Sequence, residues 1–166
     1  MDLFILRHGI AVEHGAHGFK EPDRPLTAKG ERKLWQAAEA MEALKLSFDL
    51  ILSSPYTRAR QTAEIIAEAF NARKKLEFSD SLIPGGNMKD LVGFINHYHP
   101  TPDSVLLVGH EPYLSELISL LVSGEASVLL TFKKGGLCKL STDSLKPARC
   151  ATLEWLLTPK QLGLMA

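Results

Sequence analysis

The 166-residue chain has only two cysteines, Cys138 and Cys150, which are too few for a disulfide scaffold and too far apart to form a close pair of metal ligands. We expect both thiols to be reduced and buried. No apolar run approaches the length of about 18 residues that a membrane-spanning helix needs. The N-terminal segment has an acidic second residue, Asp2, and only four consecutive apolar residues, which is not the pattern of a secretory signal. These absences predict a cytoplasmic protein without disulfides or a membrane segment.

The chain also lacks an excess of charge of either sign, because 19 Lys and Arg residues balance 19 Asp and Glu residues. A protein held on nucleic acid or on anionic lipid by its overall charge is basic, so this balance argues against both partners. Any anion must instead be bound by a local cluster. The 45% hydrophobic and 23% charged residues are typical of a globular protein, and the length predicts a single domain over 1–166.

Short β-type segments alternate with longer segments of helical periodicity along most of the chain. Strands are predicted at 3–6, 49–53, 75–78 and 104–108, and helices at 28–44, 55–70, 89–98 and 112–122. Shorter β-type runs at 128–132, 137–141 and 152–157 are expected to add edge strands. This alternation predicts an α/β three-layer sandwich, in which a mostly parallel central sheet carries helices on both faces.

Polar motifs follow three of the predicted strands. Arg7 and His8 end the first strand, Arg58 lies one helical turn beyond the second, and His110 ends the fourth. Polar residues at a strand end are common, and each of these alone needs no functional explanation. Because the carboxyl ends of parallel strands meet at one edge of a sheet, however, the four side chains are expected to lie together, where ligands of such sheets bind.

Two arginines and two histidines at one edge are suited to phosphoryl transfer. Arginine binds phosphate oxygens through two parallel N–H bonds and stays charged, and the N-terminus of the helix predicted at Pro55 would add a favourable dipole. One histidine can be neutral and nucleophilic at pH 7 while a second is cationic and stabilises the phosphoryl oxygens. Gly9 would let the backbone close tightly around the anion.

Three segments resemble the signature blocks of the histidine phosphatase superfamily, whose fold is phosphoglycerate-mutase-like. They are residues 6–9 (Leu-Arg-His-Gly), 53–63 (Ser-Ser-Pro-Tyr-Thr-Arg-Ala-Arg-Gln-Thr-Ala) and 108–112 (Val-Gly-His-Glu-Pro). The blocks cover most of 3–122, and in this order they are specific. The short chain and the Asp-Arg-Pro-Leu-Thr segment at 23–27 narrow the resemblance to the SixA-type phosphohistidine phosphatases.

The resemblance implies a role for each of these residues. His8 attacks phosphorus and becomes a transient phosphohistidine that water hydrolyses, which releases inorganic phosphate. Arg7, Arg58 and His110 hold the phosphoryl oxygens and stabilise their charge in the transition state. Arg24 matches the pattern more loosely, and its alternative is a solvated arginine before a turn. Arginines supply the positive charge, so no metal ion or other cofactor is expected.

The sequence departs from the larger family members, which carry an acidic proton donor in an insertion after the third strand. Here the corresponding segment, 79–87, is short and Asp80 is its only acid; Glu111 is the other candidate donor. An alkoxide leaving group needs a donor, whereas a phosphoimidazole protonated on its other nitrogen departs as neutral imidazole. A site without a committed acid is therefore better matched to P–N than to P–O cleavage.

Without a long insertion the pocket is expected to be open and shallow. Such a pocket would admit a phosphohistidine on a protein surface, such as that of a phosphotransfer domain or a phosphocarrier protein. His14 and His17 lie in the loop after His8 and are expected near the pocket mouth or in solvent. Two alternatives remain: a small-molecule phosphomonoesterase or mutase of the same superfamily, and a non-catalytic phosphate-binding adaptor.

Overall fold

The apolar segments of the chain form one six-stranded sheet, and the computed structural model describes all of residues 1–166. The strand order is β3-β2-β4-β1-β5-β6. The first four strands in sequence are parallel to one another: β1 (Asp2–Arg7), β2 (Leu50–Ser53), β3 (Leu76–Phe78) and β4 (Ser104–Gly109). Beyond β1 the sheet continues with two antiparallel strands, β5 (Leu137–Ser141) and β6 (Thr152–Leu157).

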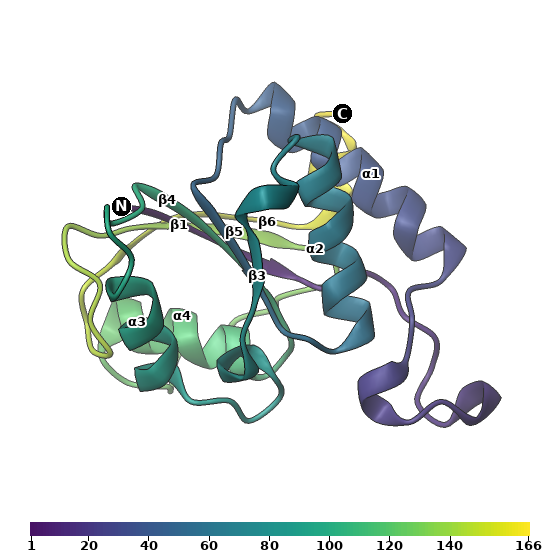
Figure 1. Cartoon of the computed structure of the whole chain (residues 1–166), viewed down its shortest axis with the longest axis horizontal. Coiled ribbons are helices and arrows are strands. Elements are labelled where there is room, and N and C mark those ends of the chain that lie inside the picture. Colours follow the sequence, from purple (N-terminus) through teal and green to yellow (C-terminus); the bar gives the residue numbers. More distant parts are fainter.

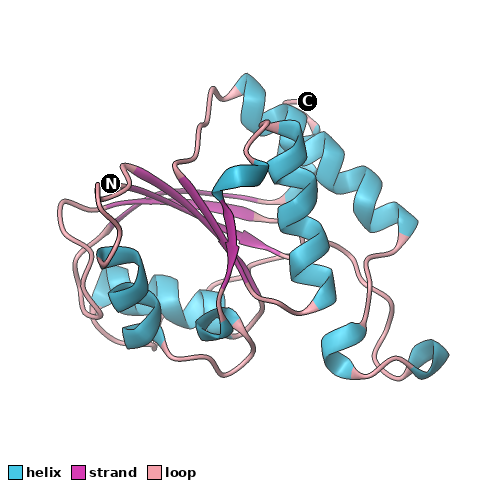
Figure 2. Cartoon of the chain, in the orientation of Figure 1, coloured by secondary structure: helices cyan, strands magenta, loops and turns pink.

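Helices cover both faces of this sheet (Figures 1 and 2). One face packs against α1 (Ala28–Ala43), α2 (Thr57–Ala69) and α5 (Pro159–Gly163), and the other against α3 (Met88–Asn96) and α4 (Tyr113–Ser123). Successive side chains of a strand point to opposite faces, so β1 contributes Phe4 and Leu6 to one core and Leu3 and Ile5 to the other. The predicted three-layer α/β sandwich is confirmed.

Thr27 caps α1, as predicted, by accepting a hydrogen bond from the Gly30 N–H. The start of α2 differs from the sequence prediction. The helix expected from Pro55 begins at Thr57. Tyr56 has an extended backbone with ψ of 134°, and its N–H donates to the Ser54 side chain, so the chain turns once before the helix starts. Arg58 consequently lies in the first turn of α2.

The late segments also differ from expectation. Residues 128–132 do not form a strand, and only Phe132 in that segment is buried. β5 is not an edge strand, because it pairs with both β1 and β6; the two edges are β3 and β6.

The topology brings three strand ends together. Arg7 at the end of β1 lies beside Gly109 of β4, and Ser53 at the end of β2 lies beside Val108. After β1 the chain leaves the sheet in a long segment with two short 3₁₀ helices, η1 (Ala16–Gly18) and η2 (Glu21–Asp23), which protrude at the lower right of Figure 1. It returns to α1 next to the same strand ends, where η2 contacts α2.

Candidate active site

His8 is fixed in place by backbone atoms at the end of β1. Its main-chain N–H donates to the Gly109 carbonyl over 3.1 Å. Its ring Nδ1 lies 2.8 Å from the Gly9 carbonyl oxygen, which can only accept, so Nδ1 carries the proton. The other ring nitrogen, Nε2, therefore has a lone pair, and it faces the Arg58 Nε at 3.3 Å. The tautomer presents a nucleophilic nitrogen to the arginine.

The surroundings of His8 keep this imidazole neutral. The pKa of His8 is lowered to about 2, mainly by burial; the hydrogen bond to Gly9 opposes this shift, and the charges of His110, Arg58 and Arg7 add to it. A neutral imidazole at pH 7 is the form that can attack phosphorus. The electrostatics of the site thus agree with the tautomer set by the backbone.

Arg58 extends from the first turn of α2 into the centre of the site and is only 3% exposed. Its Nε and Nη2 form one edge of the guanidinium, the edge that binds two oxygens of a phosphate in parallel. Nε donates to His8 Nε2, and Nη2 donates to the Glu21 carboxylate at 3.0 Å. The third nitrogen, Nη1, donates to the Glu21 backbone carbonyl at 2.9 Å. The Tyr56 ring lies 5.5 Å from the guanidinium carbon.

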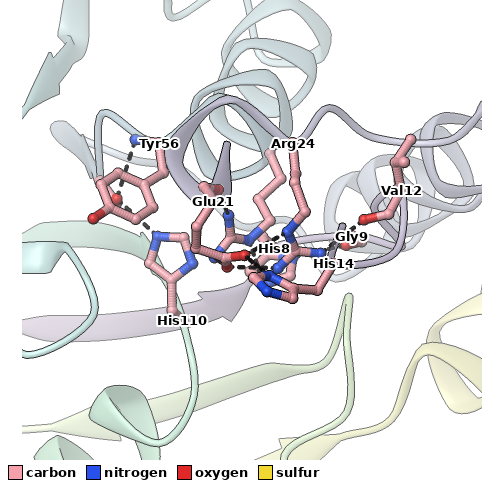
Figure 3. Close-up of polar contacts among 10 residues, drawn as sticks. His8, Gly9, Val12, His14, Glu21, Arg24, Tyr56 and His110 are labelled. Atoms are coloured by element: carbon pink, nitrogen blue, oxygen red, sulfur yellow. Dashed lines mark hydrogen bonds and ion pairs between the residues drawn. The ribbon is translucent and has the colours of Figure 1, made fainter. Parts of the chain in front are cut away.

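His110 approaches from the end of β4, with its ring centre 5.1 Å from that of His8. Its Nε2 is 2.8 Å from the Ser54 hydroxyl, while its Nδ1 is buried without a partner and faces Glu21 and His8 (Figure 3). Burial, with Arg58 second, lowers the pKa of His110 to about 3. In the protein alone this burial favours the neutral ring, whereas the sequence prediction of a cationic second histidine concerns the ring against phosphoryl oxygens.

Arg7 is the last residue of β1 and precedes His8 in the chain. Its Nη1 donates to the Phe132 carbonyl at 2.8 Å, whereas its Nε is buried without a partner. Burial lowers the pKa of Arg7 and Glu111 opposes this, but a guanidinium stays charged. Arg7 Nε and His110 Nδ1 are thus two buried polar atoms at the site that nothing in the chain satisfies, as expected where a polar ligand binds.

Arg24 reaches the site through a carboxylate that the sequence prediction missed. Its Nη2 and Nε donate to the two oxygens of Glu21 at 2.6 and 2.8 Å, and its Nη1 donates to the Val12 carbonyl at 2.7 Å (Figure 3). Since Glu21 also binds Arg58, one carboxylate joins the two arginines. The only sequence signal was a Glu three residues before an Arg, which is too common to single out.

The remaining predicted residues are not arranged as expected. The Gly9 N–H donates to the Thr62 hydroxyl at 3.1 Å, and a Cβ at Gly9 would lie 2.7 Å from the Leu34 side chain. Gly9 therefore serves close packing, and its N–H is not free for an anion. The Glu111 carboxylate accepts from the N–H and hydroxyl of Ser115, which ties it to the first turn of α4.

Asp80 lies in η4 (Asp80–Leu82) and is exposed to solvent. Glu21 raises the pKa of His110 against the effect of burial, whereas Asp80 is not among the causes of the pKa shift of either histidine. Neither acid predicted from the sequence as proton donor is therefore hydrogen-bonded to the histidines or arginines of the site.

The site is more enclosed than the short 79–87 segment predicted. His8 is 5% exposed and His110 1% exposed, and the loop after β1 carries the Glu21 side chain to Arg58 beside them. His14 in the same loop is exposed and binds Glu21 at 2.7 Å, whereas His17 is exposed in η1. The open, shallow pocket expected from the sequence is thus not what the structure shows.

The chain offers no group of three or more His, Cys, Asp or Glu side chains placed to hold a metal ion. None of its helices combines the length and the apolar character needed to cross a membrane. Cys138 is buried and Cys150 partly buried, and both are free. Burial raises the pKa of the Cys138 thiol to about 12, which disfavours the thiolate form.

The chain is similar to a family model and to several known proteins. A family model described as the histidine phosphatase superfamily (branch 1) matches residues 3–83. The chain is 36% identical over 147 residues to an uncharacterized protein of Picosynechococcus sp., covering 88% of each. It is 30% identical over 129 residues to a phosphohistidine phosphatase SixA homolog of Haemophilus influenzae, covering 73% of this chain and 77% of the relative.

The chain is also 28% identical over 167 residues to the phosphohistidine phosphatase SixA of Escherichia coli K12. That alignment covers 98% of this chain and 96% of the relative. Among solved structures, that of the protein histidine phosphatase SixA complexed with tungstate has a TM-score of 0.83 and 26% sequence identity. It covers 98% of this chain and 99% of the other. The similarity therefore includes α3 and the C-terminal strands, which lie beyond the segment that the family model matches.

Proposed function

Because the chain belongs to the histidine phosphatase superfamily, we propose that it removes the phosphoryl group from a phosphohistidine-bearing protein through a covalent intermediate on His8. One observation carries this proposal. His8 presents a neutral Nε2 to the same Arg58 edge that would bind phosphoryl oxygens, with the proton held on Nδ1 by Gly9. The SixA relatives support phosphohistidine as the substrate, and tungstate, which one of them binds, is tetrahedral like phosphate.

In the first step the lone pair of His8 Nε2 forms a bond to phosphorus while the P–N bond of the substrate breaks. The electron pair of that bond leaves on the substrate imidazole, which departs neutral when its other nitrogen is protonated. In the second step a water oxygen attacks phosphorus, the electron pair of the P–N bond returns to His8 Nε2, and inorganic phosphate leaves with the two protons of the water. In both steps the phosphoryl oxygens are held by Arg58, Arg7 and His110. Arg7 Nε and His110 Nδ1, which have no hydrogen-bond partner in the chain, gain these oxygens as partners.

The phosphoryl dianion also changes the charge of His110. A negative charge against an imidazole raises its pKa, so binding favours the protonated ring that the buried site disfavours by itself. His110 would then donate from Nδ1 to a phosphoryl oxygen while Ser54 accepts from Nε2. The cationic form belongs to the complex rather than to the free protein.

The preference for P–N over P–O cleavage follows from the acids of the site. Asp80 is exposed and Glu111 is tied to Ser115, so neither is positioned to protonate an alkoxide. A neutral imidazole needs no such donor. Together with the similarity to SixA phosphohistidine phosphatases, this supports a phosphohistidine on a phosphotransfer domain or a phosphocarrier protein as the substrate, rather than a small phosphoester.

The test compares the hydrolysis of a phosphohistidine peptide with that of an alkyl phosphate ester. We expect faster release of inorganic phosphate from the peptide, and acid-labile labelling of the protein that His8→Ala abolishes. Faster ester hydrolysis would favour the phosphomonoesterase alternative, and binding of phosphate without label on His8 would favour the adaptor. Full activity in EDTA is expected, because arginines supply the positive charge. We assign the activity to one domain, residues 1–166, acting in the cytoplasm.

A further inference from the structure

The Glu21 carboxylate lies where the proposed reaction needs a phosphoryl group. The same guanidinium edge of Arg58 donates to His8 Nε2 and to Glu21 Oε1, at 3.3 and 3.0 Å. Two parallel N–H bonds of one edge hold their acceptors side by side, so Oε1 is the immediate neighbour of the attacking nitrogen. A phosphoryl group bound to Arg58 in front of His8 would have to place an oxygen at this position.

From this geometry we propose that Glu21 is a specificity-determining residue: its carboxylate substitutes for a phosphoryl oxygen on Arg58 and must be displaced before a phosphoryl dianion can reach His8. The inference rests on the proposed function and names a residue that selects the substrate by charge. A singly charged anion that displaced the Glu21 carboxylate from Arg58 would make equivalent contacts, so the exchange would contribute little binding free energy. A phosphoryl dianion brings a second charge and more acceptor oxygens to the same arginines.

The surroundings of Glu21 allow its side chain to leave without disturbing Arg58. Glu21 lies in a three-residue 3₁₀ helix outside the sheet, and its side chain is 39% exposed. The Arg58 Nη1 is held by the backbone carbonyl of Glu21, not by its side chain. Arg24 is likewise held by the Val12 carbonyl. Rotation of the Glu21 side chain toward solvent therefore frees one edge of Arg58 while both arginines keep a backbone anchor.

Two other roles for Glu21 predict different results. A proton donor must hold a proton near pH 7, but the hydrogen bond from Arg24 leads the contacts that lower the pKa of Glu21 to about 2. Loss of a donor would lower kcat and leave phosphate affinity unchanged. If Glu21 instead served to hold Arg58 in position, its removal would weaken the binding of phosphate. Displacement alone predicts tighter binding when the carboxylate is removed.

The experiment is calorimetric titration of the whole chain with inorganic phosphate, for the wild type, Glu21→Gln and Glu21→Ala. Because both variants remove a charge-assisted acceptor that competes for Arg58, we expect the dissociation constant to fall about tenfold in each. The KM for a phosphohistidine peptide should fall by a similar factor. Thermal unfolding of each variant verifies that it is folded.

Asp23→Asn is the matched control. Asp23 lies in the same 3₁₀ helix and is exposed, and its replacement removes the same charge without touching Arg58. We expect Asp23→Asn to leave phosphate affinity within twofold of the wild type. Equal tightening in Asp23→Asn would show that overall charge, not the contact with Arg58, is responsible, and would overturn the proposal.

The failure of this inference can be told from the failure of the proposed function. If the wild type binds phosphate and the two Glu21 variants bind it equally or more weakly, the role of Glu21 is refuted and the proposed function stands. If neither the wild type nor either variant binds phosphate, both are refuted.

Discussion

The hydroxyl of Thr62 links the nucleophile to the helix that carries Arg58, and its removal tests whether that link matters. The hydroxyl accepts from the Gly9 N–H at 3.1 Å and donates to the Arg58 backbone carbonyl at 2.7 Å. Thr62 is fully buried in the middle of these contacts. Thr62→Val keeps the shape of the side chain but removes both hydrogen bonds, so that the Gly9 N–H is buried without an acceptor.

An unsatisfied buried donor costs about 2 kcal/mol, which for a domain of this size lowers Tm by about 6 °C. Because Gly9 is the neighbour of His8 and accepts from its Nδ1, a shift of this segment also moves Nε2 relative to Arg58. A displacement of well under 1 Å is enough for about a tenfold loss of kcat/KM. Urea unfolding and the hydrolysis of a phosphohistidine peptide measure the two effects.

Thr142→Val is the control, since Thr142 is also buried and its hydroxyl donates to the Cys150 carbonyl and accepts from the Ser144 N–H. This threonine pairs with Met1, at the opposite end of β1 from His8. We expect Thr142→Val to lose comparable stability with unchanged kcat/KM. Wild-type stability and activity in Thr62→Val would refute the reasoning, as would an equal loss of activity in both variants.

Three further predictions concern charge, pH and packing. Arg58→Lys should lower kcat at least a hundredfold in the same assay, since a lysine cannot bind two phosphoryl oxygens in parallel; a loss below threefold would contradict this. Burial holds the pKa of His8 at about 2 and that of His110 at about 3, below the 6.5 of the unfolded chain, so the unfolded state takes up protons first as pH falls. The free energy of unfolding should therefore decrease below pH 6.5, by up to about 1.4 kcal/mol per pH unit for each histidine, and equal urea midpoints at pH 7 and pH 5 would disprove it. Gly30→Ala should destabilise the fold by about 1–3 kcal/mol, because its Cβ would overlap the Ile10 carbonyl oxygen, and an unchanged Tm would show that this contact relaxes freely.

The parts of the fold that follow from local pattern could be predicted from the sequence. The strand at 104–108 contains a continuous apolar run, 105–108, and the structure extends the strand by one residue to Gly109. Helix α1 has its apolar residues on one face and Thr27 at its start, and it ends one residue earlier than predicted. That Arg7 lies beside the end of β4 could be predicted from the rule that the carboxyl ends of parallel strands meet at one edge of a sheet.

The parts that depend on long-range pairing could not be predicted in the same way. The segment 128–132 has the composition of a strand, but in the structure it pairs with neither edge strand of the sheet, β3 or β6. Glu21 follows His8 by thirteen residues in a loop without periodicity, and only the path of that loop brings its carboxylate to Arg58. His8 is buried although the 79–87 segment is short, so the length of that segment does not by itself determine how open the site is.

The most direct test of the account is the position of the phosphoryl group on the enzyme during turnover. Rapid acid-free quenching of the protein with a phosphohistidine peptide, followed by ¹⁵N–³¹P coupling measurements on ring-labelled histidine, identifies the phosphorylated nitrogen. Because the Gly9 carbonyl holds the proton on Nδ1, we expect phosphorus on Nε2 of His8. Phosphorus on Nδ1 of His8, on His110, or on no histidine during measurable turnover would contradict it.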